Sequence, residues 1–205
     1  DLGIFSCKMK VKDVDAAWKY WTDNGVEVMG KPVADPSGKK SFFVRDPFGN
    51  IFHIVGATDW FMNLKKISGG SYGAIIGVSD VEKALGLYSG ILGYDRVVYD
   101  VTGSFEDLSA VPGGGGRFRR VLLAPSRPFH GGVNPIFGQS VIELVQALDR
   151  PVTRIFEGRL WGDPGFIHLC YDIRGMDNLR KHCTEAGFPF TVDSETSHAG
   201  DSLDM

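Results

Sequence analysis

The stretch IGVSDVEKALGLYSGILGYDRV, residues 76–97, has the pattern of a short strand, a polar turn, an amphipathic helix and a second strand. Asp80 stands at the turn, and apolar residues recur at helical spacing after it. Gly93 stands where the helix should end, because glycine adopts the left-handed conformation that follows many helices at little cost. The stretch therefore predicts a strand–helix–strand unit.

The same pattern occurs twice more in the chain. It is found in MKVKDVDAAWKYWTDNGVEV, residues 9–28, and in YDIRGMDNLRKHCTEAGFPF, residues 171–190. The separation from Val11 to Gly25 is 14 positions, and the corresponding separations in the second and third segments are 15 and 14. We interpret the three segments as internal repeats of one structural unit.

Further strands are predicted after the first two helices. FFVRDPFGNIFHIV, residues 42–55, is similar to VNPIFGQSVIELVQ, residues 133–146, with His53 of the first at the place of Glu143 in the second. Glu143 alternates with Ile142 and Leu144, so we expect its side chain on the opposite face of the strand. Each repeat is thus predicted to be a βαβββ module, and the fold class is predicted to be α+β.

These modules resemble those of the vicinal oxygen chelate superfamily, which includes glyoxalase I, bleomycin-resistance proteins and extradiol dioxygenases. The resemblance rests on VSDVEKALGLYSGILGY (78–94), DPFGN (46–50) and GFIHLCYDIRGMDNLRKHCTEAGF (165–188). It implies tandem modules that pair, with curved mixed sheets that form an open cup.

The resemblance also implies a domain organisation. Residues 1–58 would be a single module, the second half of a domain whose first half is absent. Residues 71–205 would be a domain of two paired modules that lacks its last strand. We therefore expect the sequence to be a trimmed piece of a longer, multi-module protein.

In this superfamily, metal ligands lie on the first and last strands of each module. The resemblance places the first-strand positions at Ser6, Gly73 and His168, and the last-strand positions at His53 and Glu143. Pairing of the second and third modules would bring Glu143 and His168 together, and we expect these two to bind a divalent metal ion, Zn, Mn, Ni or Fe. Gly73 departs from the pattern, because glycine has no side chain with which to bind a metal.

Two residues are candidates for substrate binding. His53 stands at a ligand position whose partner in the same module is only Ser6. Arg119, in GGGGRFRR (113–120), is placed to meet an anionic substrate tail. Purely structural roles stay open for both residues. The metal ligands have such alternatives too: Glu143 could lie on a solvated strand face, and His168 could be a core histidine.

Two main functions follow from the resemblance. One is a divalent-metal-dependent lyase or isomerase of glyoxalase type, acting on a small oxygen-bearing substrate. The other is a metal-free small-molecule-binding module of bleomycin-resistance type, and a ring-cleaving dioxygenase is a third alternative. No catalytic residue is assigned by the sequence.

The composition narrows the class of partner. The 205 residues carry a formal net charge of −3 without a block of like charge, so a nucleic-acid partner is not expected. No apolar stretch is long enough to predict a membrane span. The three cysteines lack CxxC spacing, which indicates neither disulfides nor a zinc knuckle. We expect a cytoplasmic protein that binds a small-molecule substrate and forms a homo-dimer.

Overall fold

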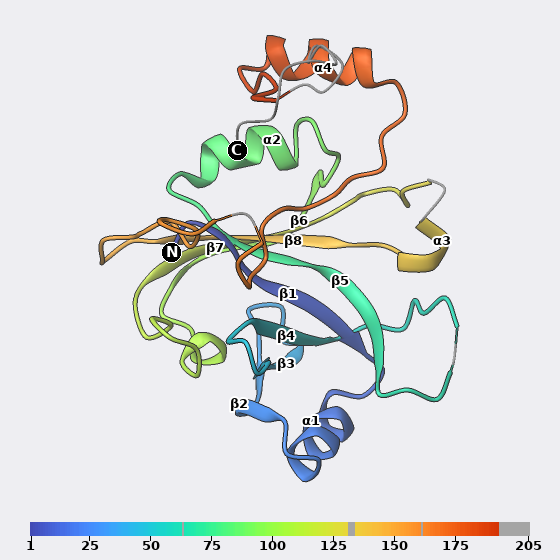
Figure 1. Cartoon of the computed structure of the whole chain (residues 1–205), viewed down its shortest axis with the longest axis vertical. Helices are drawn as coiled ribbons and strands as arrows, with labels where there is room; N and C mark the ends of the chain where they lie inside the picture. The colour runs from blue at the N-terminus through green and yellow to red at the C-terminus, as the bar shows by residue number, and fades with distance from the viewer. Residues whose placement is uncertain (63, 131–133, 161, 193–205) are drawn as a thin grey trace. The chain divides into compact units, whose positions relative to one another are not determined.

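The structure is a computed structural model that describes residues 1–62, 64–130, 134–160 and 162–192 (Figure 1). The chain divides into two compact units, Asp1–Asp172 and Ile173–Met205. The strands and the candidate site lie in the first unit, and the second unit contains one helix among its described residues.

Two βαβββ modules make up most of the first unit, as the repeats predict. The first module consists of β1 (Gly3–Val11), α1 (Val14–Asp23), β2 (Glu27–Ala34), β3 (Lys40–Arg45) and β4 (Ile51–Gly56). The second consists of β5 (Ser68–Gly77), α2 (Val81–Tyr88), β6 (Arg96–Gly103), β7 (Phe118–Ala124) and β8 (Val141–Ala147), with two short additions, η1 (Glu106–Leu108) and α3 (Asn134–Phe137). The predicted α+β class is confirmed.

The helix boundaries have the local causes that the sequence indicates. Asp13 Oδ1 accepts a hydrogen bond from the Ala16 N–H at 3.0 Å, which caps α1. Asp80 caps α2 in the same way through the Lys83 N–H. Gly25 follows α1 with a φ of +72°, the left-handed conformation expected for a glycine after a helix.

The third repeat agrees with the pattern only in its helix. α4 (Met176–Glu185) is preceded by Gly175 at the cap position, and Asp177 lies in the first turn. Among the described residues from 162 to 175, none belongs to a strand. Residues 188–192 form no strand, although one is expected after Gly187, and the last strand expected for this repeat lies outside the described residues.

One eight-stranded sheet unites the first two modules, in the order β2-β3-β4-β1-β5-β8-β7-β6. β1 pairs in parallel with β4, and β5 pairs in parallel with β8, so the two modules repeat the same internal arrangement. The antiparallel pairing of β1 with β5 joins them at the centre of the sheet. Figure 1 shows these strands as a curved sheet.

This pairing differs from the domain organisation expected from the sequence. We expected the first module to pair with a unit before residue 1, and the second to pair with the third. In the structure, the first and second modules share one sheet. The expected boundary at residue 58 falls in the connector between β4 and β5, whereas residue 71 lies within β5. Module pairing is decided by edge-to-edge hydrogen bonding of β1 and β5, for which the repeat pattern holds no signal.

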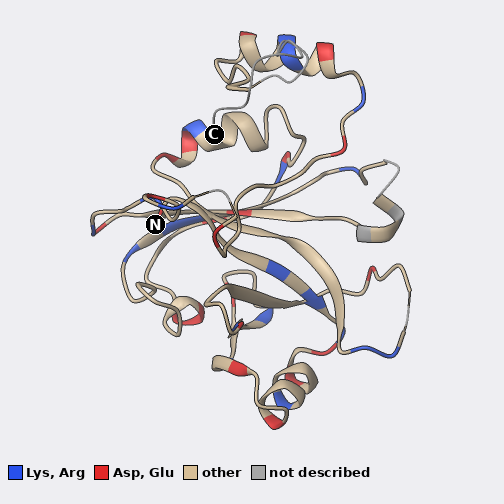
Figure 2. Ribbon diagram, viewed as in Figure 1, with Lys and Arg blue, Asp and Glu red and all other residues tan. Residues whose placement is uncertain are grey.

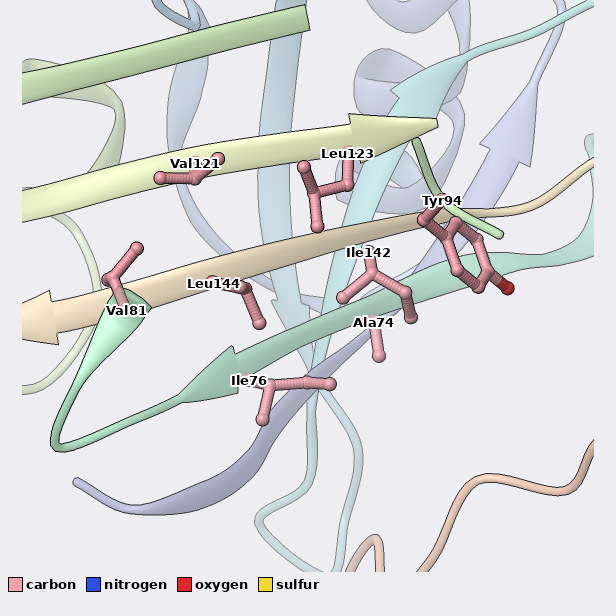
Figure 3. Packing of buried hydrophobic residues seen from close by; sticks show 8 residues of the cluster. All are labelled: Ala74, Ile76, Val81, Tyr94, Val121, Leu123, Ile142 and Leu144. Carbon is pink, nitrogen blue, oxygen red and sulfur yellow. The ribbon is translucent and has the colours of Figure 1, made fainter. Parts of the chain in front are cut away.

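The helices α1 and α2 pack against one face of the sheet. Apolar residues of β5, β7 and β8 meet Val81 at the start of α2 (Figure 3). A second cluster joins Ala17 of α1 to Phe42 of β3 and Ile54 of β4. The opposite face of the sheet therefore carries the residues that alternate with these, and polar groups occupy its middle.

No helix among the described residues is both long enough and apolar enough to cross a membrane.

Candidate functional site

Lys8 lies at the centre of a buried polar network on the face of the sheet opposite to α1 and α2. Its ammonium Nζ donates a hydrogen bond to Glu143 Oε2 at 2.7 Å and lies 2.9 Å from His53 Nδ1. Lys8 is directly opposite His53 in the β1–β4 register, whereas Glu143 reaches it from β8 in the other module. The network therefore links the two modules through side chains.

Glu143 has partners on both of its carboxylate oxygens. Oε1 accepts hydrogen bonds from the Tyr99 hydroxyl at 2.8 Å and from Arg120 Nε at 2.8 Å. Arg120 in turn donates from Nη1 to Asp107 Oδ1 at 2.7 Å. A continuous chain of charge-assisted hydrogen bonds thus runs from β1 through β8 and β7 to η1.

The charges in this network balance. Lys8 and Arg120 supply two positive charges, and Glu143 and Asp107 supply two negative charges, so the sum is zero. All four are buried, with Arg120 and Glu143 completely inaccessible to solvent. Figure 2 shows the basic residues of β1 as two blue bands within the sheet. Buried charges are tolerated only when they are paired, and this network meets that condition.

The neighbouring charges fix the ionisation states. Burial alone raises the pKa of the Glu143 carboxyl, but the positive charges of Lys8 and Arg120 outweigh it, and the pKa lies well below the usual value. Burial and the positive charge of Lys8 hold the pKa of His53 well below its usual value. Burial, together with the charge of Glu143, raises the pKa of Tyr99. Glu143 is therefore a carboxylate and His53 is neutral near pH 7.

The ring of His53 is held on two sides. It stacks on the ring of Phe43 with centroids 4.3 Å apart and an angle of 11° between the planes. Because the Lys8 ammonium donates to Nδ1, the proton of the neutral ring is assigned to Nε2. Nε2 is buried and has no hydrogen-bond partner among the described residues.

A pocket of about 110 Å³ lies beside the network, with Lys8 in its lining. Its apolar lining comes from β4, β6, β7 and β8: Val55, Val98, Leu122, Ala124 and Val141. Its charged lining consists of Lys8, Asp35, Lys39, Lys40 and Arg96. The pocket also contains Ser41, whose buried hydroxyl has no hydrogen-bond partner among the described residues.

The structure confirms the face predicted for Glu143. Ile142 and Leu144 belong to the apolar cluster that packs against α2, and Glu143 points to the opposite face of β8. His168 lies in the segment 165–172, which has no regular secondary structure, and its side chain is exposed. The hydrogen-bond partners of Glu143 are Lys8, Tyr99 and Arg120. The proposal that Glu143 and His168 share a metal ion stays a prediction, and the contacts of Glu143 do not favour it.

Arg119 lies on the outer face of β7, whereas its neighbour Arg120 points into the network. Arg119 donates a hydrogen bond to Glu82 at 2.7 Å and two to Asp100, at 3.0 and 2.8 Å. It does not line the pocket described above. Its role in substrate binding therefore stays a prediction, and alternation along the strand explains why adjacent arginines differ in role.

The strand register shows which residues lie opposite the last-strand positions. Lys8 is opposite His53 in the first module, and Ile75 is opposite Glu143 in the second. The assignment of Ser6 and Gly73 to the first-strand positions stays a prediction. Gly73 has a φ of +148°, and a Cβ there would lie 1.8 Å from the Val141 carbonyl oxygen. Glycine at this position is thus required by close strand packing and does not open space for a ligand.

Sequence reasoning missed Lys8, Tyr99 and Asp107 as members of the site. The run FSCKMKV, residues 5–11, alternates apolar and polar residues and places Ser6, Lys8 and Lys10 on one face of the strand. This alternation is typical of a strand with one solvated face, so it gave no signal that the lysines are buried. The partner residues come from strands far away in the sequence and could not be identified from it.

The possible metal ligands in the network, Glu143 and His53, are not arranged to bind a divalent metal ion. Both oxygens of Glu143 are already bonded, and the Lys8 ammonium lies at the point where Glu143 Oε2 and His53 Nδ1 converge. A dication there would meet an existing positive charge. Among the residues that the structure describes, no group of three or more His, Cys, Asp or Glu side chains is arranged to hold a metal ion.

Comparisons with known proteins give one family-model match and several structural neighbours. The family model of the Glyoxalase/Bleomycin resistance protein/Dioxygenase superfamily matches residues 5–54, which span β1 to β4. No curated protein sequence matches the chain. Glyoxalase I from Zea mays is 15% identical with a TM-score of 0.45, over 72% of this chain and 44% of that one. A variant of Streptomyces coelicolor methylmalonyl-CoA epimerase, in complex with 2-nitronate-propionyl-CoA, is 18% identical with a TM-score of 0.39, over 74% and 99%. The chain therefore spans less than half the length of the glyoxalase I that it matches.

Proposed function

We propose that this chain, whose first module matches the glyoxalase/bleomycin resistance/dioxygenase family model, is a small-molecule-binding module that needs no bound metal. The observation that carries this proposal is the pocket beside Lys8, which combines apolar walls with positively charged groups. Such a combination is typical of sites for small organic ligands. We propose a small carboxylate with an apolar body as the ligand.

The charge of the lining favours an anion. Four cationic side chains face one carboxylate, Asp35. Two of these cations are already paired, Lys8 with Glu143 and Lys40 with Asp15. Lys39 and Arg96 still leave an excess of one positive charge over Asp35 in the pocket lining. An anion would be attracted to this surface, and an amine would be repelled.

Ser41 supplies a further reason for a polar ligand group. Its hydroxyl is buried, lines the pocket and has no partner among the described residues. A buried hydroxyl without a hydrogen bond costs free energy, and a ligand oxygen in the pocket would remove that cost. The volume of about 110 Å³ limits the enclosed part of the ligand to a few heavy atoms. A cavity of about 150 Å³ is known to hold benzene.

The metal-dependent lyase or isomerase is the competing function, and it needs free ligands for a metal ion. Glu143 was the main candidate, but its oxygens bind Lys8, Tyr99 and Arg120. This favours the binding module over the enzyme. Elemental analysis of the full-length protein, purified without a His tag, distinguishes the two: stoichiometric metal that is lost in Glu143→Ala would support the enzyme.

The ligand is tested by calorimetric titration of the whole chain in the presence of EDTA. Benzoate and butyrate are compared with benzylamine and butylamine, which match them in size and carry the opposite charge. We expect the acids to bind and the amines not to bind. Arg96→Gln should weaken binding of the acids several-fold. The control is Lys19→Gln, which breaks an exposed ion pair with Asp23 on α1 and should leave binding of the acids unchanged. Equal affinity for acids and amines, or no binding of either, would overturn the proposal.

A further inference from the structure

A nitrogen and an oxygen from different modules converge on a single point inside the sheet. His53 Nδ1 on β4 lies 2.9 Å from the Lys8 Nζ, and Glu143 Oε2 on β8 lies 2.7 Å from it. A neutral imidazole and a carboxylate are the donors that divalent ions such as Zn²⁺, Co²⁺ and Ni²⁺ take in proteins. The two donors are held in place from outside, His53 by its stacking on Phe43 and Glu143 by Arg120.

We propose that His53 and Glu143 form a cation-binding position that the chain fills with its own Lys8 ammonium, and that an added cation binds there only when this amine is removed. The Lys8 ammonium donates hydrogen bonds to His53 Nδ1 and to Glu143 Oε2, which uses two of its three N–H groups. The binding position is thus occupied by a covalently attached cation that cannot be lost to a chelator.

The charge balance of the network explains why the wild-type position should reject a metal. The charges of Lys8 and Arg120 offset those of Glu143 and Asp107. A dication added to this buried group would leave two uncompensated positive charges, which is costly in an interior of low dielectric. Removal of the Lys8 amine leaves a net charge of −1, which an added cation would neutralise or reverse.

Lys10 provides a matched control on the same strand. It is also buried and lies two positions from Lys8, so it points to the same face of β1. Its ammonium contacts a different residue, donating to the Asp59 carbonyl oxygen at 2.8 Å. Truncation of Lys10 therefore removes a buried lysine without exposing the His53–Glu143 pair.

The test is Co²⁺ titration of the full chain, followed by calorimetry and by the visible absorption of the bound ion. Lys8→Ala should bind one Co²⁺ at least tenfold more tightly than the wild type or Lys10→Ala. The double variant Lys8→Ala/Glu143→Gln should lose this gain. Lys10→Ala also reports background binding by the cysteines and by exposed histidines, which is common to all these chains.

A second measurement uses the cation in organic form. n-Propylamine corresponds to the part of the lysine side chain that alanine lacks, and 1-propanol is a neutral molecule of similar size. Propylamine should raise the Tm of Lys8→Ala by several degrees and leave Lys10→Ala unchanged, and propanol should have no such effect. If Lys8→Ala is unfolded alone, refolding on addition of Co²⁺ or propylamine is the expected result.

Three results would overturn the proposal. One is stoichiometric metal on the wild-type chain that Glu143→Gln removes. Another is a folded Lys8→Ala chain that gains no affinity for Co²⁺ and no stability from propylamine. The last is a Lys8→Ala chain that neither cation refolds. The inference is independent of the carboxylate ligand proposed above, because a chain that binds no benzoate can still show the gain in Co²⁺ affinity.

Discussion

Lys8 Nζ on β1 and Glu143 Oε2 on β8 form an ion pair of 2.7 Å between the two modules of the sheet, with both side chains almost entirely shielded from solvent. β5 lies between the two strands, so this pair spans the junction at which the modules meet. Stability of the two-module sheet should therefore depend on the pair more than on any exposed ion pair.

Removal of the Glu143 charge should destabilise the protein strongly. Glu143→Gln leaves Lys8 without a neutralising partner and Arg120 with Asp107 alone, and loss of one partner of a buried ion pair costs about 3–5 kcal/mol. The free energy of unfolding in urea measures this cost. Glu82→Gln, which breaks the exposed pair with Arg119, is the control and should cost at most about 1 kcal/mol. A similar cost for both variants would contradict the role given to the network.

Acidification should destabilise the protein from about pH 6.5 downward. His53 has a folded-state pKa below its usual value of 6.5, so the unfolded chain takes up a proton before the folded chain does. The contribution of His53 to the free energy of unfolding is fully present above pH 6.5. It is lost as the pH falls, by at most about 1.4 kcal/mol per pH unit. Unfolding in urea between pH 7.5 and 5 measures this loss.

A second loss should follow below about pH 4.5. The pKa of Glu143 is likewise lowered, so its contribution is present above 4.5 and declines as the pH falls toward its folded-state pKa. His53→Gln should flatten the dependence between pH 6.5 and 5 and leave the second loss in place. An unchanged slope in that variant would show that His53 is not the group responsible.

Ser41→Ala should have opposite effects on the free protein and on ligand binding. Loss of a buried hydroxyl without a partner should leave the free energy of unfolding unchanged or raise it by up to about 1 kcal/mol. If the hydroxyl bonds to the ligand, benzoate affinity should fall about fivefold or more. Thermal unfolding and calorimetric titration check the two parts, and a clear loss of stability in the free protein would indicate a structural partner for Ser41.

Gly73→Ala should destabilise the protein by about 3 kcal/mol or more. The new Cβ would overlap the Val141 carbonyl oxygen, and the φ of +148° is unfavourable for alanine. Gly115→Ala is a suitable control, since a Cβ at Gly115 would meet no atom within 4 Å. Equal stability of the two variants in urea would show that β5 and β8 can separate at little cost.

The sequence by itself determined the modules. The spacing of the helices, the aspartate caps and the glycines after them depend on residues close together in the chain, and the structure places β1 to β8 in the predicted order. Alternation along β8 likewise predicted the face of Glu143, because neighbouring side chains on a strand always point to opposite sides.

Only the tertiary structure decided which modules pair and which residues meet Glu143. Lys8 and Glu143 are 135 positions apart, and their contact depends on the register of β1 against β5 and of β5 against β8. A shift of two residues in that register would bring another residue of the same face of β1, such as Ser6, to the place of Lys8. Such a shift preserves every local pattern in the sequence, so only the packing of the strands against one another could fix it.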